Sequence, residues 1–167
     1  PTPTSSPTPR PTPTSTPFPT PTPILSPTDS KLEDDLSYFY GNWGQALTEY
    51  QTLLTRSPSE IEKSAAMLGM GKTYFQLEDY PRALEYLRGL LTSYPDSPYT
   101  AEAHFNLALT YSALDRHLEA ASSLEAYLNV RPGVIDSYIQ ERRGHALPAA
   151  GNNLAAINAY QSALSAD

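Results

Sequence analysis

The sequence predicts an all-α protein, a superhelical array of about four helix–turn–helix hairpins behind a disordered Pro/Thr-rich segment. Three observations predict this fold class. The composition changes abruptly after Thr28, a set of small and bulky residues recurs every 36 or 37 residues, and the apolar residues within each interval follow the 4-then-3 spacing of one helix face.

The first segment, residues 1–29, is predicted to be a disordered linker or stalk. Residues 1–28 hold eleven of the seventeen prolines, with nine threonines and four serines. Such a segment cannot bury enough apolar surface to offset the cost of ordering its backbone, about 1–2 kcal/mol per residue. It either holds the following domain away from a membrane or wall, or joins two domains. Both interpretations favour an extracytoplasmic protein, secreted or anchored at the cell envelope.

The remainder, residues 30–167, is predicted to form repeats at about 30–60, 61–97, 98–134 and 135–167. The second helix of each repeat carries apolar residues at fixed spacing: Ala46, Tyr50 and Leu53; Ala83, Leu87 and Leu90; Ala120, Leu124 and Tyr127; and Ala156, Tyr160 and Ala163. A proline follows in the first three repeats, at Pro58, Pro95 and Pro132, and is expected to stop the helix.

The first helix of each repeat is predicted from a small residue and a bulky residue three positions later. These pairs are Gly71 and Tyr74, Ala108 and Tyr111, and Gly144 and Leu147, while Trp43, Tyr80, His117 and Asn153 are expected to mark the turns between the helices. The small residues allow a partner helix to approach closely.

Gly71 belongs to a Gly-Met-Gly-Lys-Thr stretch that superficially suggests a phosphate-binding loop. Such a loop also needs glycine at position 66, where this chain has Ala66, and a strand leading into it. Residues 61–68 are predicted to be helical, and a helix interior has no free N–H groups to hold phosphate. Gly71 is therefore predicted to be a packing residue.

The order small residue, Tyr, aromatic turn residue, Ala, Leu or aromatic, and Pro strongly resembles the tetratricopeptide repeat. The best match runs through Gly71, Tyr74, Tyr80, Ala83, Leu87, Leu90 and Pro95, and the resemblance covers roughly residues 30–167. Asp34 and Ser37 depart from the pattern in the first repeat, and Leu147 and Pro148 in the last. The resemblance implies a non-catalytic scaffold that binds a protein or peptide in a concave groove lined by the first helices.

Two details refine this resemblance. The interval of 37 residues and the connector Tyr94–Tyr99 look like repeat proteins of the bacterial cell envelope. Gln140–Leu147 is also similar to the helical N-terminal regions of soluble lytic transglycosylases. The second resemblance implies an alternative, in which this chain is the helical part of a cell-wall lytic enzyme whose catalytic domain lies outside it.

Candidate groove residues follow from the family's partner-contacting positions on the first helices. They are Leu68, Lys72, Phe75, Gln76, Phe105, Leu109, Ser112, Glu141 and His145, to which the first repeat would add Asp35, Tyr38 and Phe39. Each apolar member could instead belong to the core or to the contact with the next repeat. Two or three aromatic or apolar anchors plus Lys72 would suffice for micromolar binding.

Composition argues against other classes of function. The net charge of -7 disfavours nucleic acids and anionic membranes, and cysteine is absent. His104, His117 and His145 lack metal-ligand spacing, and no nucleophile–His–carboxylate grouping is present, so no enzyme activity, cofactor or metal is expected. No apolar run is long enough to cross a bilayer. Self-association through the terminal repeat, which shows no polar capping helix, is a further interpretation.

Overall fold

The computed structural model describes residues 36–57, 59–133 and 135–165, and every regular element in them is a helix. The helices are α2 (Trp43–Arg56), α3 (Glu60–Gln76), α4 (Tyr80–Ser93), α5 (Thr100–Ala113), α6 (His117–Val130), α7 (Asp136–Ala149) and α8 (Asn153–Ser165). Residues 36–39 add a short helical stretch before α2. The predicted all-α fold is confirmed. The predicted stalk, Asp34, Asp35 and Pro58 lie outside the described residues.

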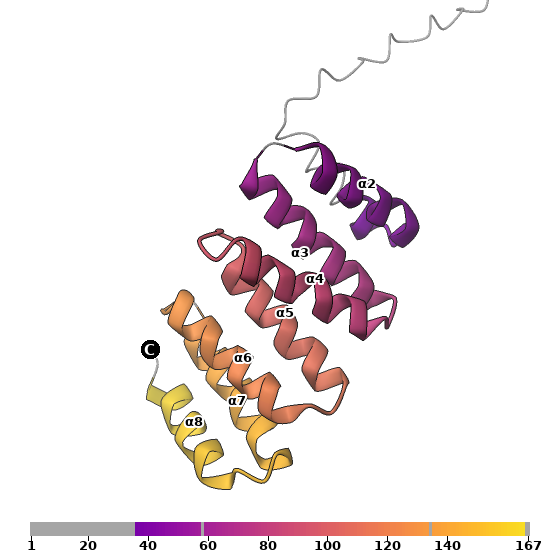
Figure 1. Ribbon diagram of the computed structural model, residues 1–167. Helices are drawn as coiled ribbons and strands as arrows, with labels where there is room; N and C mark the ends of the chain where they lie inside the picture. The colour runs from indigo at the N-terminus through magenta and orange to yellow at the C-terminus, as the bar shows by residue number, and fades with distance from the viewer. Residues whose placement is uncertain (1–35, 58, 134, 166–167) are drawn as a thin grey trace, which may run out of the picture.

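The helices form a linear stack of hairpins (Figure 1). Each helix packs on its neighbours in the sequence, and α3 also contacts α5, the first helix of the following hairpin. Contacts are therefore made within hairpins and between adjacent hairpins, as a repeat array requires.

Small residues set the spacing within the hairpins. A Cβ added to Gly71 in α3 would lie 2.6 Å from Leu87 Cγ of α4, and one added to Gly144 in α7 would lie 2.7 Å from Tyr160 Cε1 of α8. Leu87 is fully buried. The prediction that Gly71 is a packing residue is confirmed, since a larger side chain would displace the helix that it faces.

The same backbone turn joins the two helices of every hairpin. Gly41, Glu78, Asp115 and Gly151 all have φ between 56° and 77°, in the left-handed region. In each turn, the N–H of the next residue donates to a carbonyl five residues back, as from Asp79 to Tyr74 and from Arg116 to Tyr111. This geometry is a helix C-cap that closes the first helix.

The turn geometry corrects one expectation. Trp43, Tyr80, His117 and Asn153 do not lie in the turns; each is the first residue of the second helix. The left-handed residue two positions earlier makes the reversal, and the bulky residue then begins the next helix.

The connectors between hairpins begin where proline ends a helix. The helix α4 ends at Ser93, two residues before Pro95, and α6 ends at Val130, two residues before Pro132. Ser97 Oγ then donates to Ser64 Oγ of α3 at 2.7 Å and accepts from the Tyr99 N–H. The connector is thus fixed to the preceding hairpin, which sets the direction in which α5 enters.

Candidate functional site

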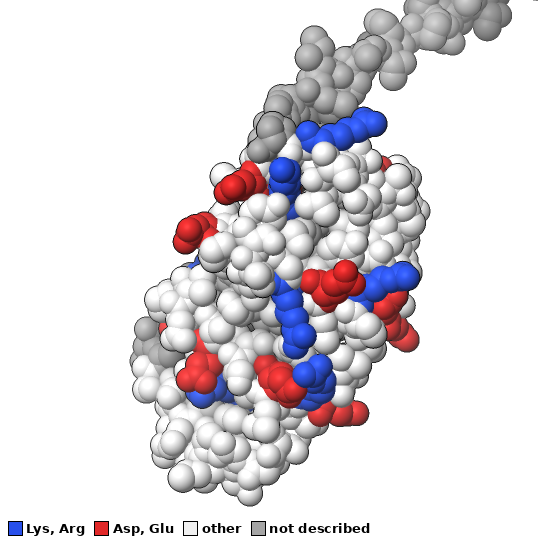
Figure 2. Space-filling model, in the orientation of Figure 1, with Lys and Arg blue, Asp and Glu red and all other residues white. Residues whose placement is uncertain are grey.

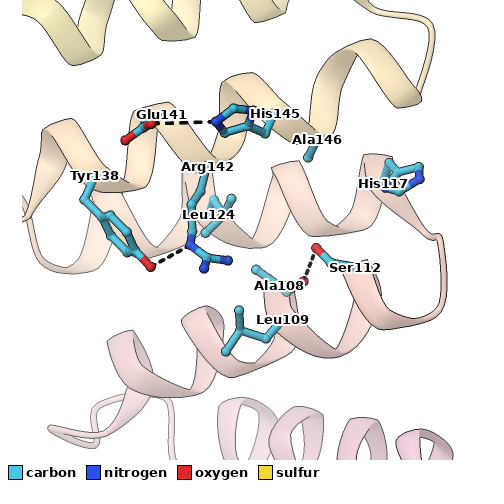
Figure 3. A pocket seen from close by; sticks show the side chains of 10 residues that line it. All are labelled: Ala108, Leu109, Ser112, His117, Leu124, Tyr138, Glu141, Arg142, His145 and Ala146. Atoms are coloured by element: carbon cyan, nitrogen blue, oxygen red, sulfur yellow. Dashed lines mark hydrogen bonds and ion pairs between the residues drawn. The ribbon is translucent and has the colours of Figure 1, made fainter.

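The face formed by the first helices is hollowed between α5 and α7 (Figure 3). The hollow has a volume of about 510 Å³ and is lined by Ala108, Leu109, Ser112, His117, Leu124, Tyr138, Glu141, Arg142, His145 and Ala146. Its floor is apolar because Ala108, Leu124 and Ala146 are buried core residues whose side chains pack where α5, α6 and α7 meet. The short side chains of Ala108 and Ala146 leave the space of the hollow unfilled.

Polar groups from α7 form one wall of the hollow. Arg142 Nε donates to the Tyr138 hydroxyl at 2.6 Å, and its guanidinium carbon lies 5.2 Å from the centre of the Tyr138 ring. The guanidinium end lies inside the hollow (Figure 3). Because its position is fixed by a hydrogen bond and a cation–π contact, it can meet a carboxylate or carbonyl oxygen with little loss of side-chain freedom.

His145 stands at the outer edge of the same wall. Its Nε2 lies 3.7 Å from Glu141 Oε1, and its Nδ1 lies 3.1 Å from the Tyr160 hydroxyl. On the opposite helix, the Ser112 hydroxyl donates to the Ala108 carbonyl at 2.8 Å. The hollow therefore combines an apolar floor with one guanidinium, one carboxylate and one imidazole along α7.

The structure divides eight of the nine predicted groove residues on α3, α5 and α7 into two groups, and the ninth, Leu68, lies in the core. Leu109, Ser112, Glu141 and His145 line the hollow. Lys72, Phe75, Gln76 and Phe105 instead contact other side chains of this chain.

Lys72 illustrates the second group. Its Nζ lies 3.1 Å from Glu102 Oε1 in α5 and 5.3 Å from the centre of the Tyr38 ring, so it joins three successive first helices. Gln76 Nε2 donates to the Tyr38 hydroxyl at 3.3 Å. Lys72 and Gln76 of the predicted groove thus contact the protein's own side chains.

The aromatic members are similarly engaged. The Phe75 ring lies 5.7 Å from that of Tyr80, and the Phe105 ring lies 6.3 Å from that of Tyr127. Leu68 needs correction as a groove residue, because it is only 5 % exposed and belongs to the core between α3 and α4. Tyr38 is half-buried and Phe39 is exposed.

Sequence reasoning missed Tyr138 and Arg142. The signal was their spacing of four residues, continued by Ala146, which places all three on one face of a helix.

Metal-binding groups, membrane-spanning helices and shifted pKa values were also sought in the described residues. In the ranges 36–57, 59–133 and 135–165, no three His, Cys, Asp or Glu side chains are grouped to hold a metal ion. None of the helices described is long and apolar enough to span a bilayer. Burial lowers the pKa of His104 in α5, which lies outside the hollow.

Comparisons with known proteins agree with the repeat pattern seen in the sequence. A family profile described as "Tetratricopeptide repeat" matches residues 62–132. No curated protein sequence gives a significant match.

Several solved structures share the fold. "Crystal structure of MamA" has a TM-score of 0.69 at 17% identity and aligns 83% of this chain with 76% of that chain. "MamA 41-end from Desulfovibrio magneticus RS-1" has a TM-score of 0.66 at 16% identity, over 84% of this chain and 75% of the other. At these identities the likeness concerns the fold.

Proposed function

We propose that this chain, whose residues 62–132 match the tetratricopeptide repeat profile, is a protein-interaction scaffold that holds a segment of a partner protein in the hollow between α5 and α7. The observation that carries the proposal is the open apolar floor beside the positioned guanidinium of Arg142.

The size and chemistry of the hollow suit a short polypeptide segment. A volume of about 510 Å³ accommodates a few side chains but not a folded domain. An apolar side chain of the partner placed on Leu109 and Leu124 would gain about 1.5–3 kcal/mol from burial. Arg142 would bind a carboxylate or a main-chain carbonyl beside it. Two such anchors and several backbone contacts are enough for micromolar affinity, about -8 kcal/mol, after the costs of association.

Lys72 is an unsuitable position at which to test the groove by substitution. Replacing Lys72 by Glu would place two carboxylates together, because Lys72 pairs with Glu102. Any loss of binding would then include damage to the stack. Leu109 is a better position, since its side chain lines the hollow and is not among the fully buried core residues.

The test uses peptides selected from a phage-displayed random library against the 167-residue chain. Binding of a selected peptide is measured by fluorescence anisotropy to the parent protein and to Leu109→Glu. A charge on the floor should weaken binding at least about tenfold, because it removes an apolar anchor and leaves a desolvated carboxylate.

The matched control is Leu118→Glu, which introduces the same charge at a leucine on α6 that is 54% exposed and outside the hollow. It should leave the affinity unchanged, with both variants helical by circular dichroism. Selected peptides that bind Leu109→Glu as tightly as the parent would place the binding surface elsewhere.

We also propose that the scaffold works outside the cytoplasm. The Pro/Thr-rich composition of residues 1–28 and the 37-residue repeat interval support this location. A reporter enzyme that is active only outside the cytoplasm can be fused to the protein as the cell makes it. An inactive reporter on a stably produced fusion would contradict the location without affecting the groove.

A further inference from the structure

The hollow between α5 and α7 differs in its residues from the equivalent place one repeat earlier. Between α3 and α5, Lys72 and Glu102 form an ion pair that joins the two first helices, with Nζ 3.1 Å from Oε1. The equivalent positions one repeat later hold Leu109 and Tyr138, which line the hollow. A leucine and a tyrosine cannot form such a pair, so α5 and α7 lack the charge pair that joins α3 to α5.

Arg142 supplies this hollow with a positive charge that has no carboxylate beside it. Among the described residues, no Asp or Glu oxygen lies within ion-pair distance of its guanidinium, whose contacts are the hydroxyl and the ring of Tyr138. The next residue in the chain, Arg143, is different, because its Nη2 lies 3.0 Å from Glu125 Oε2. Of these two neighbouring arginines, the one that lines the hollow is thus the one without a carboxylate partner in the described part of the chain.

The contacts of Arg142 leave the end of its guanidinium available to a partner. Its Nε donates to the Tyr138 hydroxyl, while the two terminal nitrogens point into the hollow (Figure 3). The Tyr138 ring lies 6.4 Å from the ring of Phe105 in α5, so it is supported from the opposite wall. Two adjacent N–H groups held in a plane match the two oxygens of a carboxylate.

The carboxylate that also lines the hollow, that of Glu141, does not take this position. Its Oε1 lies 3.7 Å from His145 Nε2. Figure 3 shows the side chains of Glu141 and His145 on the edge of α7 that faces away from the guanidinium of Arg142. The terminal nitrogens of Arg142 are therefore not neutralised from within the wall that carries them.

The charge of the rest of the molecule does not favour an acidic partner. The chain has a net charge of -7, and Figure 2 shows acidic and basic side chains interspersed on the face in view, without a large patch of one sign. Long-range attraction therefore cannot draw a negatively charged segment to the protein. Any preference for a carboxylate in the hollow must come from Arg142 at short range, and a single substitution should remove it.

We propose that Arg142 makes the hollow select partner segments that carry an Asp or Glu side chain beside the apolar residue placed on Leu109 and Leu124; this inference rests on the function proposed above. A carboxylate accepts hydrogen bonds from both terminal nitrogens and neutralises the cation, whereas a main-chain carbonyl carries no charge and a basic side chain would meet a like charge. A side chain can reach the guanidinium while the segment continues in both directions, so the apolar anchor and the main chain keep their contacts.

The test uses library-selected peptides whose binding is weakened by Leu109→Glu, synthesised with an amidated C-terminus so that no free chain end is present. Each acidic residue of a peptide is exchanged for its amide, and both forms are titrated by fluorescence anisotropy. At one acidic position the exchange should weaken binding to the parent protein about fivefold or more. Arg142→Gln should bind both forms alike, because it no longer presents a cation to the carboxylate.

The matched control is Arg131→Gln, which makes the same change of net charge at an exposed arginine that follows α6 and lies outside the hollow. It should keep the preference for the acidic form. Arg142→Glu should reverse the preference, so that a peptide with Lys at the acidic position binds this variant more tightly than the acidic peptide does.

The outcomes separate this inference from the proposed function. Leu109-dependent peptides that contain no Asp or Glu, or a preference for the acidic form that survives Arg142→Gln, overturn the selection by Arg142 and leave the hollow as the binding site. Peptides that bind Leu109→Glu as tightly as the parent overturn both proposals.

Discussion

At the scale of single residues, Gly71 shows how a missing methyl group fixes the distance between two helices. Its own α3 lies so close to α4 that a Cβ would meet Leu87 Cγ at 2.6 Å, and Leu87 is fully buried. Gly71→Ala should therefore destabilise the protein by about 1–3 kcal/mol, since the core must shift to accept the methyl group. Chemical denaturation measures the change.

Gly44 supplies the matched control. It lies in the first turn of α2, and a Cβ there meets nothing within 4 Å. Gly44→Ala should be neutral or stabilise by up to about 1 kcal/mol through helix propensity. Equal effects of the two substitutions would show that Gly71 is not a packing residue.

At the left-handed turn residues, in contrast to Gly71, a substitution is predicted to stabilise the protein. Gly41 and Gly151 occupy two of the four equivalent turn positions, but Glu78 and Asp115 occupy the other two with φ of 58° and 56°. A residue with a Cβ is strained by about 1–2 kcal/mol in this conformation, and glycine would remove that strain. Glycine also loses more conformational entropy on folding, which offsets about 0.5–1 kcal/mol of the gain. Asp115→Gly should thus raise the free energy of unfolding by about 0.5–1 kcal/mol. A destabilised variant would show that the Asp115 side chain, 4.0 Å from His117 Nε2, contributes more than its backbone costs.

At the scale of elements, α5 carries a histidine that makes stability depend on pH. Burial lowers the pKa of His104 below its ordinary 6.5, because the folded protein disfavours the charged ring. The unfolded chain then binds more protons than the folded chain as pH falls below about 6.5. Stability should decrease between pH 7.5 and pH 5.5, a window above that in which carboxylates titrate.

His104→Gln should reduce this decrease, because glutamine does not titrate. Melting temperatures of the parent and the variant at the two pH values provide the measurement. An identical loss of stability in both proteins would show that His104 does not contribute to it.

The elements also show what the sequence could and could not predict. Pro95 and Pro132 end their helices as expected, because a proline ring acts locally whatever surrounds it. The repeat position of Gly71 identified it as a packing residue, and its contact, Leu87, lies within the same repeat. Local periodicity was sufficient for these features.

The candidate site depended on how the hairpins stack, and so it was predicted less well. Lys72 was predicted to contact a partner, and the sequence did not reveal that it pairs with Glu102, which is 30 residues away in the sequence and next to it in the stack. Leu68 was expected in the groove and lies in the core. Residue spacing predicts which residues share one face of a helix. The rotation of that helix about its axis, set by packing against its neighbours, decides which residues of that face remain exposed.

At the scale of the whole molecule, the two halves of the face formed by the first helices differ among the described residues. In the N-terminal half, Lys72 and Gln76 of α3 both contact Tyr38 in the short helical stretch before α2. Between α5 and α7, the small residues Ala108 and Ala146 leave the surface hollow. A repeat array can hold a partner only where its own side chains do not fill the curve, and this difference places the proposed binding surface in the C-terminal half.

The most direct test of the scaffold proposal is chemical-shift mapping by NMR during titration of the 167-residue chain with a peptide selected for binding. The account predicts that perturbations concentrate at residues lining the hollow, including Leu109, Ser112, Arg142 and His145, and leave the outer residue Leu118 unchanged. Perturbations centred on Leu118 and the outer face of α6, with the residues of the hollow unaffected, would contradict it.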